Sequence, residues 1–144
     1  MLRRSTRDSG GVMLARRRPP SARFLRPSSP VAASTFSTGN GSNPADIVVV
    51  SPSKAYVSLY QRPGLLIMNP TTGATVGGVD LSSFADADGF PEMDHLARFG
   101  RWLFVSVQRL DEAHGFVPTD SSQVVVIDTA ADTVVDVNRG VPGK

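Results

Sequence analysis

The sequence predicts an all-β fold, because its last two thirds contain one arrangement of short strands and turns twice. Asp46 and Asp94 lie 48 residues apart, and Ser58 and Ser106 are separated by the same distance. A repeat of about 40–50 residues built from short strands is typical of a β-propeller blade. The sequence therefore predicts two four-stranded blades after a disordered N-terminal tail, and the blades cover approximately residues 43–82 and 91–138.

The first blade is predicted from four segments separated by turns rich in Pro, Gly and Ser. Residues 46–50 form a β-branched run, and residues 55–60 alternate between two faces. Residues 65–69 are apolar on both faces, which indicates a strand covered on both sides. Residues 74–79 then predict a short outer strand containing two consecutive glycines. Asn69, at the end of the third segment, is expected to hydrogen-bond the following turn.

The second blade repeats this order with one insertion. Asn69 and its counterpart Asp128 are 59 residues apart rather than 48, so 11 residues are inserted between the second and third strands. The insertion lies in the loop 109–122. The four predicted strands are residues 93–97, 102–108, 123–128 and 133–137.

Two short segments carry a family resemblance. Ala55-Tyr56-Val57-Ser58 and the run from Val126-Ile127-Asp128-Thr129 to Val134 resemble the repeat of the YVTN family of β-propellers, a group similar to surface-layer and lactonase-like propeller proteins. The resemblance implies a seven-bladed ring, often secreted or attached to the cell surface, and it implies no shared active site. The second copy lacks the Tyr-Val pair and reads Phe104-Val105-Ser106 instead.

The number of blades limits the interpretation of the chain. A closed propeller needs roughly four to eight blades, and two blades leave sheet faces and edges in water. Three interpretations are open: a fragment of a longer propeller, which is preferred, a homo-oligomer that closes a ring from several copies, and a small open sheet domain.

The predicted tail, residues 1–42, differs sharply in charge from the repeat region. Residues 1–44 carry eight arginines and one acidic residue, whereas residues 45–144 carry seven basic and twelve acidic residues. The Arg, Ser and Pro content predicts disorder. A transit peptide, a nucleic-acid-binding arm and a non-native extension are alternatives for this tail. Because the repeat region is acidic, no nucleic-acid partner is expected.

The chain contains no run of about 18 apolar residues, so no transmembrane segment is predicted. Arg16, Arg17 and Arg18 stand where a secretory signal would have its apolar core, so no such signal is expected in this segment.

An acidic cluster in the link between the blades is the candidate metal site. Asp86, Asp88, Glu92 and Asp94 lie within nine residues, and Gly89 allows a tight turn among them. Calcium takes roughly six to eight oxygen ligands, which carboxylates supply. The spacing is not that of an EF-hand. A solvated acidic connector and a catalytic role, with His95 as base, are the alternatives.

The inserted loop is the candidate partner-binding surface. Its residues Arg109, Asp111, His114 and Phe116 combine charged and aromatic side chains, and insertions on rigid scaffolds often carry binding specificity. A plain surface excursion is the alternative.

No catalytic or cofactor-binding residue is predicted. The sequence lacks a nucleophile elbow, a phosphate-binding loop and any cysteine. The preferred function is a non-enzymatic binding scaffold, extracytoplasmic or at the cell surface, with an unknown protein or small-molecule ligand. The alternative is a lactonase-like or dehydrogenase-like propeller enzyme that acts on a small molecule over the central channel. These two functions differ in whether acidic or histidine side chains from several blades converge.

Overall fold

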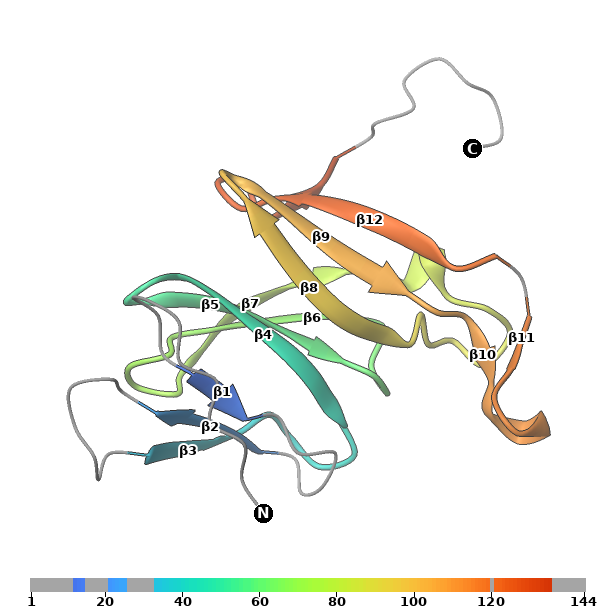
Figure 1. Cartoon of the computed structure of the whole chain (residues 1–144), viewed down its shortest axis with the longest axis horizontal. Coiled ribbons are helices and arrows are strands. Elements are labelled where there is room, and N and C mark those ends of the chain that lie inside the picture. The colour runs from blue at the N-terminus through green and yellow to red at the C-terminus, as the bar shows by residue number, and fades with distance from the viewer. Residues whose placement is uncertain (1–11, 15–20, 26–32, 120, 136–144) are drawn as a thin grey trace.

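The computed structural model describes residues 12–14, 21–25, 33–119 and 121–135, and its strands form two four-stranded sheets, a three-stranded sheet and a small hairpin (Figure 1). The strands are β1 (Val12–Leu14), β2 (Ser21–Leu25), β3 (Ala33–Ser37), β4 (Pro44–Ser51), β5 (Lys54–Leu59), β6 (Gly64–Met68), β7 (Thr75–Asp80), β8 (Met93–Phe99), β9 (Trp102–Val107), β10 (Leu110–Asp111), β11 (Val117–Pro118), β12 (Gln123–Asp128) and β13 (Thr133–Val134). Two short 3-10 helices, η1 (Ser82–Phe84) and η2 (Glu112–His114), complete the described elements.

The first three strands lie in the segment that the sequence predicts to be a disordered tail. They form an antiparallel sheet in the order β1-β2-β3. Phe36 of β3 packs against a cluster of buried residues in the next sheet, which includes Ile47 and Val57. This apolar contact stabilises β3 against the first blade, and the composition of the segment alone does not predict it. Residues 1–11, 15–20 and 26–32 of the predicted tail lie outside the described residues, so disorder stays a prediction for them.

The two four-stranded sheets are the two predicted blades. In the first, β4, β5, β6 and β7 pair antiparallel in chain order. In the second, β8, β9, β12 and β13 pair in the same way. The β10–β11 hairpin is inserted in the chain between β9 and β12, which pair directly with each other. The prediction of two four-stranded blades with an insertion in the second is therefore confirmed.

The turn residues act as predicted. The Asn69 side-chain oxygen accepts a hydrogen bond from the Thr71 backbone N–H at 2.8 Å. The matching Asp128 carboxylate accepts one from the Ala130 N–H at 2.9 Å. The same local bond thus closes the turn after the third strand in both blades, because short polar side chains satisfy turn amides that no strand partner reaches.

The main apolar core lies between the two blades. One face of the first sheet contributes Tyr56, Leu65 and Ile67, and one face of the second contributes Leu103, Val105 and Ile127, each at most 3% exposed. Neighbouring Leu66 points to the opposite face of the first sheet, so the third strand is apolar on both faces as predicted. Complete burial of each such aliphatic side chain stabilises the fold by roughly 1.5–3 kcal/mol.

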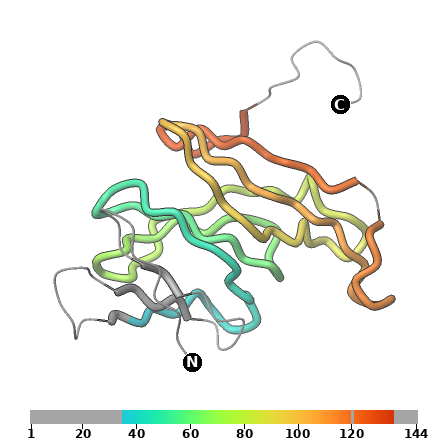
Figure 2. Tube along the Cα trace, viewed as in Figure 1, coloured from blue at the N-terminus to red at the C-terminus, as the bar shows by residue number. Residues whose placement is uncertain are grey.

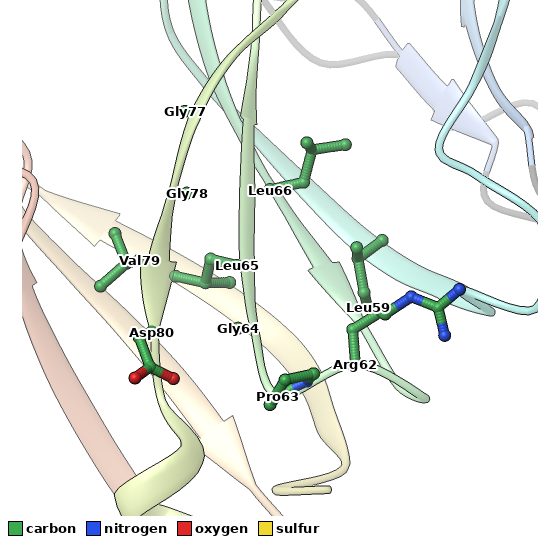
Figure 3. A pocket seen from close by; sticks show the side chains of 10 residues that line it. All are labelled: Leu59, Arg62, Pro63, Gly64, Leu65, Leu66, Gly77, Gly78, Val79 and Asp80. Atoms are coloured by element: carbon green, nitrogen blue, oxygen red, sulfur yellow. The ribbon is translucent and has the colours of Figure 1, made fainter.

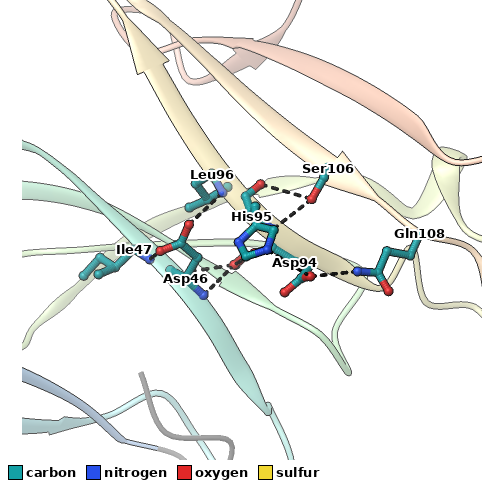
Figure 4. Close-up of polar contacts among 8 residues, drawn as sticks. Asp46, Ile47, Asp94, His95, Leu96, Ser106 and Gln108 are labelled. Atoms are coloured by element: carbon teal, nitrogen blue, oxygen red, sulfur yellow. Dashed lines mark hydrogen bonds and ion pairs between the residues drawn. The ribbon is translucent and has the colours of Figure 1, made fainter. Parts of the chain in front are cut away.

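Polar contacts join β4 and β5 of the first blade to β8 of the second (Figure 4). The Asp46 carboxylate accepts a hydrogen bond from the Leu96 N–H at 2.8 Å, and the Ser58 hydroxyl donates one to the Asp94 carbonyl at 2.6 Å. The Ser58 hydroxyl also accepts from the Asp46 N–H at 2.9 Å. These four residues form the interblade clamp, which fixes the position of the second blade relative to the first.

The opposite face of the second sheet is open to solvent. Phe99 is 78% exposed and Val124 is 64% exposed, and Phe104 on the same face is half-buried. Phe104 lies 48 residues after Tyr56, which the second blade buries completely. The open face of the second sheet is therefore equivalent to the face of the first sheet that packs against the second blade.

Within the described part of the chain, neither short helix has the length and apolar character needed to cross a bilayer.

Candidate functional site

The acidic link, defined here as residues 85–92, connects η1 to β8 and gathers three of the four predicted metal ligands. Asp86, Asp88 and Glu92 each offer a carboxylate oxygen, and these oxygens lie within 4.8 Å of one another. Two ligands on opposite sides of a calcium ion are about 5 Å apart, because each lies about 2.3–2.6 Å from the ion. The spacing of the three carboxylates is therefore compatible with calcium.

Local hydrogen bonds shape the acidic link. The Asp86 carboxylate accepts from the Asp88 N–H at 3.2 Å, and the Asp88 carboxylate accepts from the Phe90 N–H at 2.8 Å. Gly89 adopts a φ of 86°, which a residue with a Cβ rarely does. The sequence thus turns twice within five residues and brings its carboxylates to one side.

Glu92 is the unusual member of the cluster. Its side chain is completely buried, and its Oε2 accepts a hydrogen bond from the Leu110 N–H at 3.0 Å. Its Oε1 has no hydrogen-bond partner among the described residues. Burial raises the pKa of Glu92 to about 7, and the negative charges of Asp88, Asp86 and Glu112 contribute to the increase. A buried carboxylate with one unsatisfied oxygen is a position where a cation would be stabilising.

The backbone of Glu92 repeats that of Asn43 in the first blade. Both residues precede the innermost strand with a positive φ, 44° for Glu92 and 46° for Asn43. The Asn43 carbonyl accepts from the Tyr60 N–H, and the Glu92 carbonyl accepts from the Gln108 N–H. Asn tolerates this left-handed conformation well, whereas Glu does so less readily. The second blade therefore has a Glu at a position whose left-handed backbone conformation favours Asn.

The insertion hairpin, residues 109–119, carries the predicted partner-binding residues. Asp111 caps η2 by accepting from the His114 N–H at 3.1 Å, and its second oxygen lies 2.6 Å from His114 Nδ1. The hydrogen bond with His114 lowers the pKa of Asp111. Phe116 is 54% exposed with a φ of 63°, and Arg109 begins the hairpin with a φ of 56°. The hairpin thus presents an aromatic ring and a His–Asp pair to solvent.

The structure brings the acidic link and the insertion hairpin together (Figure 2). The Thr119 hydroxyl donates to the Asp86 carboxylate at 2.8 Å, and the Leu110 N–H donates to Glu92. Burial acts to raise the pKa of Asp86, but the Thr119 hydrogen bond, those from Asp88 and the charge of Arg109 lower it overall. Two segments that the sequence predicts as separate candidate sites therefore lie in contact with each other.

Asp94 does not join the other three carboxylates. Its side chain accepts a hydrogen bond from Gln108 Nε2 at 2.8 Å and lies 3.5 Å from His95 Nε2 (Figure 4). The His95 side chain is 83% exposed and lies on the strand rather than in the acidic link. The described structure thus supports a three-carboxylate cluster, with Asp94 and His95 engaged elsewhere.

Thr119 and Glu112 were not predicted to lie beside the candidate metal ligands. The Thr119 hydroxyl donates a hydrogen bond to the Asp86 carboxylate. Burial raises the pKa of Asp88, and the negative charges of Asp86 and of Glu112 raise it further, so Glu112 lies close to the carboxylate cluster. Neither residue belongs to a motif, so only the folded hairpin reveals its role.

An open pocket of about 430 Å³ lies elsewhere, over the β6–β7 edge of the first blade (Figure 3). Leu65, Leu66 and Val79 line it, and Arg62 and Asp80 stand at its rim. The close approach of Gly64 to the Val79 carbonyl shapes it, since an added Cβ would lie 2.5 Å from that oxygen. The pocket is mainly apolar and contains none of the predicted site residues.

Two antiparallel four-stranded blades with a shared core place the chain among the β-propeller-like all-β proteins. Its structure is similar to the crystal structure of Citrobacter koseri AztD, with a TM-score of 0.51 and 15% sequence identity. The likeness covers 82% of this chain and 29% of that chain, so the chain spans less than a third of the length of AztD. At this identity the likeness shows the fold alone. No family model matches the chain, and no curated protein matches its sequence.

Proposed function

We propose that the chain is part of a non-enzymatic β-propeller of the YVTN type that acts outside the cytoplasm or at the cell surface as a binding scaffold. The observation that carries this proposal is the convergence of the acidic link and the insertion hairpin at one end of the second blade. A rigid blade that presents a structured insertion is a common arrangement for binding. The hairpin residues Arg109, Asp111, His114 and Phe116 are the proposed partner contacts.

Calcium is the ion that we propose for the acidic link. The cluster of Asp86, Asp88 and Glu92 offers only oxygen ligands, which suit hard cations such as calcium. Water and backbone carbonyl oxygens would have to complete the coordination shell, since calcium takes roughly six to eight oxygen ligands. Calcium-binding modules outside cells commonly have dissociation constants of about 10⁻⁴–10⁻³ M.

Isothermal titration calorimetry tests the calcium site. Wild type is expected to give a saturable isotherm with calcium chloride. Asp88→Asn removes one exposed ligand charge and is expected to weaken binding about tenfold or more, since affinity follows the number of charged ligands. Asp80→Asn is the matched control, because Asp80 is an exposed aspartate whose carboxylate accepts hydrogen bonds from the N–H and the hydroxyl of its neighbour Ser82. An absence of heat up to millimolar calcium would remove this site.

Comparative capture tests the binding surface. Wild type, Phe116→Ser and the exposed control Val76→Ser would each be immobilised and exposed to secreted and surface fractions of the source organism. Val76 is 61% exposed on β7, far along the chain from the hairpin. One partner retained by wild type and Val76→Ser but lost from Phe116→Ser is expected. Identical partners for all three proteins would contradict the proposal, and turnover of a small molecule would favour the enzyme alternative.

A further inference from the structure

The insertion hairpin is anchored at both ends by the candidate cation ligands themselves. The Leu110 N–H, at the start of β10, donates to the Glu92 carboxylate at 3.0 Å. The Thr119 hydroxyl, directly after β11, donates to the Asp86 carboxylate at 2.8 Å. The two carboxylates that would bind an ion thus also hold the neck of the hairpin.

The buried oxygen of Glu92 points to a ligand independently of the acidic cluster. Glu92 is completely buried, and its Oε1 lacks a hydrogen-bond partner among the described residues. An unsatisfied buried carboxylate oxygen destabilises a fold, and coordination to a cation removes that cost.

A bound divalent cation would offset part of the negative charge of the site. Glu112 lies on η2 of the hairpin, and its charge acts on both Asp88 and Glu92. Arg109 offsets part of this repulsion through its effect on Asp86. Without a further positive charge the hairpin carboxylate and the acidic link repel each other, whereas a divalent cation between them attracts both.

The hairpin has little apolar packing of its own. Phe116 is 54% exposed and Val117 is 55% exposed, and β10 and β11 contain two residues each. A segment with few buried contacts opens at low free energy unless polar anchors hold it. The position of this hairpin therefore depends on the carboxylates that anchor it.

We infer that calcium bound by Asp86, Asp88 and Glu92 closes the insertion hairpin onto the second blade, so that partner binding by the hairpin depends on calcium. This inference rests on the proposed function, since it requires both the calcium site and the partner-binding hairpin. Glu112 is then a positioning residue that responds to the ion from the hairpin side.

Hydrogen exchange of the full chain tests the inference. Exchange of the amides in residues 109–119 would be followed by mass spectrometry with calcium chloride, with magnesium chloride and with neither ion. At a calcium concentration ten times the dissociation constant, an ion that binds only the closed hairpin slows this exchange by about tenfold. Exchange in β5, which lies in the core of the first blade, is expected to remain unchanged.

Two variants separate the coupling from the site. Asp88→Asn should lose the calcium effect on the hairpin without a folding defect, because Asp88 is exposed. Glu112→Gln should bind calcium while showing a smaller change in hairpin exchange. Saturable calorimetric binding with unchanged hairpin exchange would overturn the inference and leave the calcium site intact. An absence of calorimetric binding would instead overturn the calcium site, and with it this inference.

Discussion

The two blades have the same strand order and the same turn bonds, yet they use equivalent positions differently. In the first blade, Asp46 and Ser58 reach across to the backbone of the second blade. In the second blade the structurally equivalent residues are His95 and Ser106, because the His95 N–H donates to the Ser106 hydroxyl as the Asp46 N–H does to that of Ser58. The first blade's pair joins two sheets, whereas the hydrogen bonds between His95 and Ser106 lie within the second sheet.

The residue before the innermost strand shows the same division. Asn43 and Glu92 have matching backbones, but Asn43 suits its left-handed conformation and Glu92 places a carboxylate in the core. The two blades thus share a backbone conformation, while single side chains differ: those of the first blade contribute to packing between the sheets, and Glu92 of the second contributes to the candidate cation site. Four comparisons between matched positions test this division.

The largest effect is expected from neighbouring valines on the two faces of β12. Val125 is 3% exposed between the blades, and Val124 is 64% exposed on the open face. Val125→Ala should lower the free energy of unfolding by about 2–3 kcal/mol, through lost burial and the resulting cavity. Val124→Ala should change it by less than about 0.5 kcal/mol. Urea denaturation measures both, and equal losses would show that a further blade or copy covers the open face.

Glu92→Gln removes the charge of the buried carboxylate and leaves the backbone at this position in place, so it measures how much that charge lowers the stability of the fold. The folded protein holds the Glu92 proton more tightly, with a pKa of about 7 against an ordinary 4.5, so the wild type loses stability as pH rises from 4.5 to about 7. Glu92→Gln should therefore be more stable than wild type at pH 8 without calcium, by on the order of 2 kcal/mol.

The difference between Glu92→Gln and wild type should grow across that pH window and stay constant above it. Thermal denaturation at a series of pH values measures it. A difference that does not vary with pH would show that Glu92 has the same pKa in the folded and unfolded protein, so that the fold fully compensates its charge. Saturating calcium should reverse the order of stability, since only wild type keeps the full ligand set.

Much of the architecture could be predicted from sequence because strand patterns and turn chemistry act locally. The alternation in residues 55–60 and the turn residues Asn69 and Asp128 identify two blades without any long-range information. The three strands within residues 12–37 could not be predicted, because the contact of Phe36 with the first blade is made across the fold.

The candidate site was predicted only in part, because register and long-range contacts decide it. The 48-residue spacing pairs Asp46 with Asp94, but a register shift between Val49 and Ser51 of the first blade, which the second blade lacks, makes His95 the structural counterpart of Asp46. A shift of one residue moves a side chain to the other face of a strand, which no spacing in the sequence reveals. The contact of Thr119 with Asp86 spans 33 residues and leaves no local signal.

Asp46→Ala and His95→Ala form the third comparison. Removal of the Asp46 carboxylate leaves the Ile47 and Leu96 N–H groups without their acceptor, which should cost about 1–2 kcal/mol. His95→Ala removes a side chain that is 83% exposed, and the free energy of unfolding should hardly change. Equal losses of unfolding free energy in the two variants would mean that His95 makes a stabilising contact across the open face of the second blade, as Asp46 does between the two blades.

The smallest effect is expected at Lys54, whose counterpart 48 residues later is Trp102. Lys54 Nζ lies 2.6 Å from the Asp132 carboxylate and donates to the Thr129 carbonyl at 2.8 Å, so it ties the β4–β5 turn to the β12–β13 turn. The Tyr56 hydroxyl also donates to Asp132, and burial together with this bond raises the pKa of Tyr56.

Lys54→Met keeps the length of the side chain and removes its charge. Because the ion pair is partly exposed, the loss should be about 0.5–1 kcal/mol at low salt and smaller at 1 M sodium chloride. Urea denaturation at the two salt concentrations measures it, with Arg98→Met, on the exposed end of β8, as the control. A loss that salt does not reduce would assign the contact to the neutral bond with Thr129, so that the turns of the two blades are joined by backbone recognition rather than by charge.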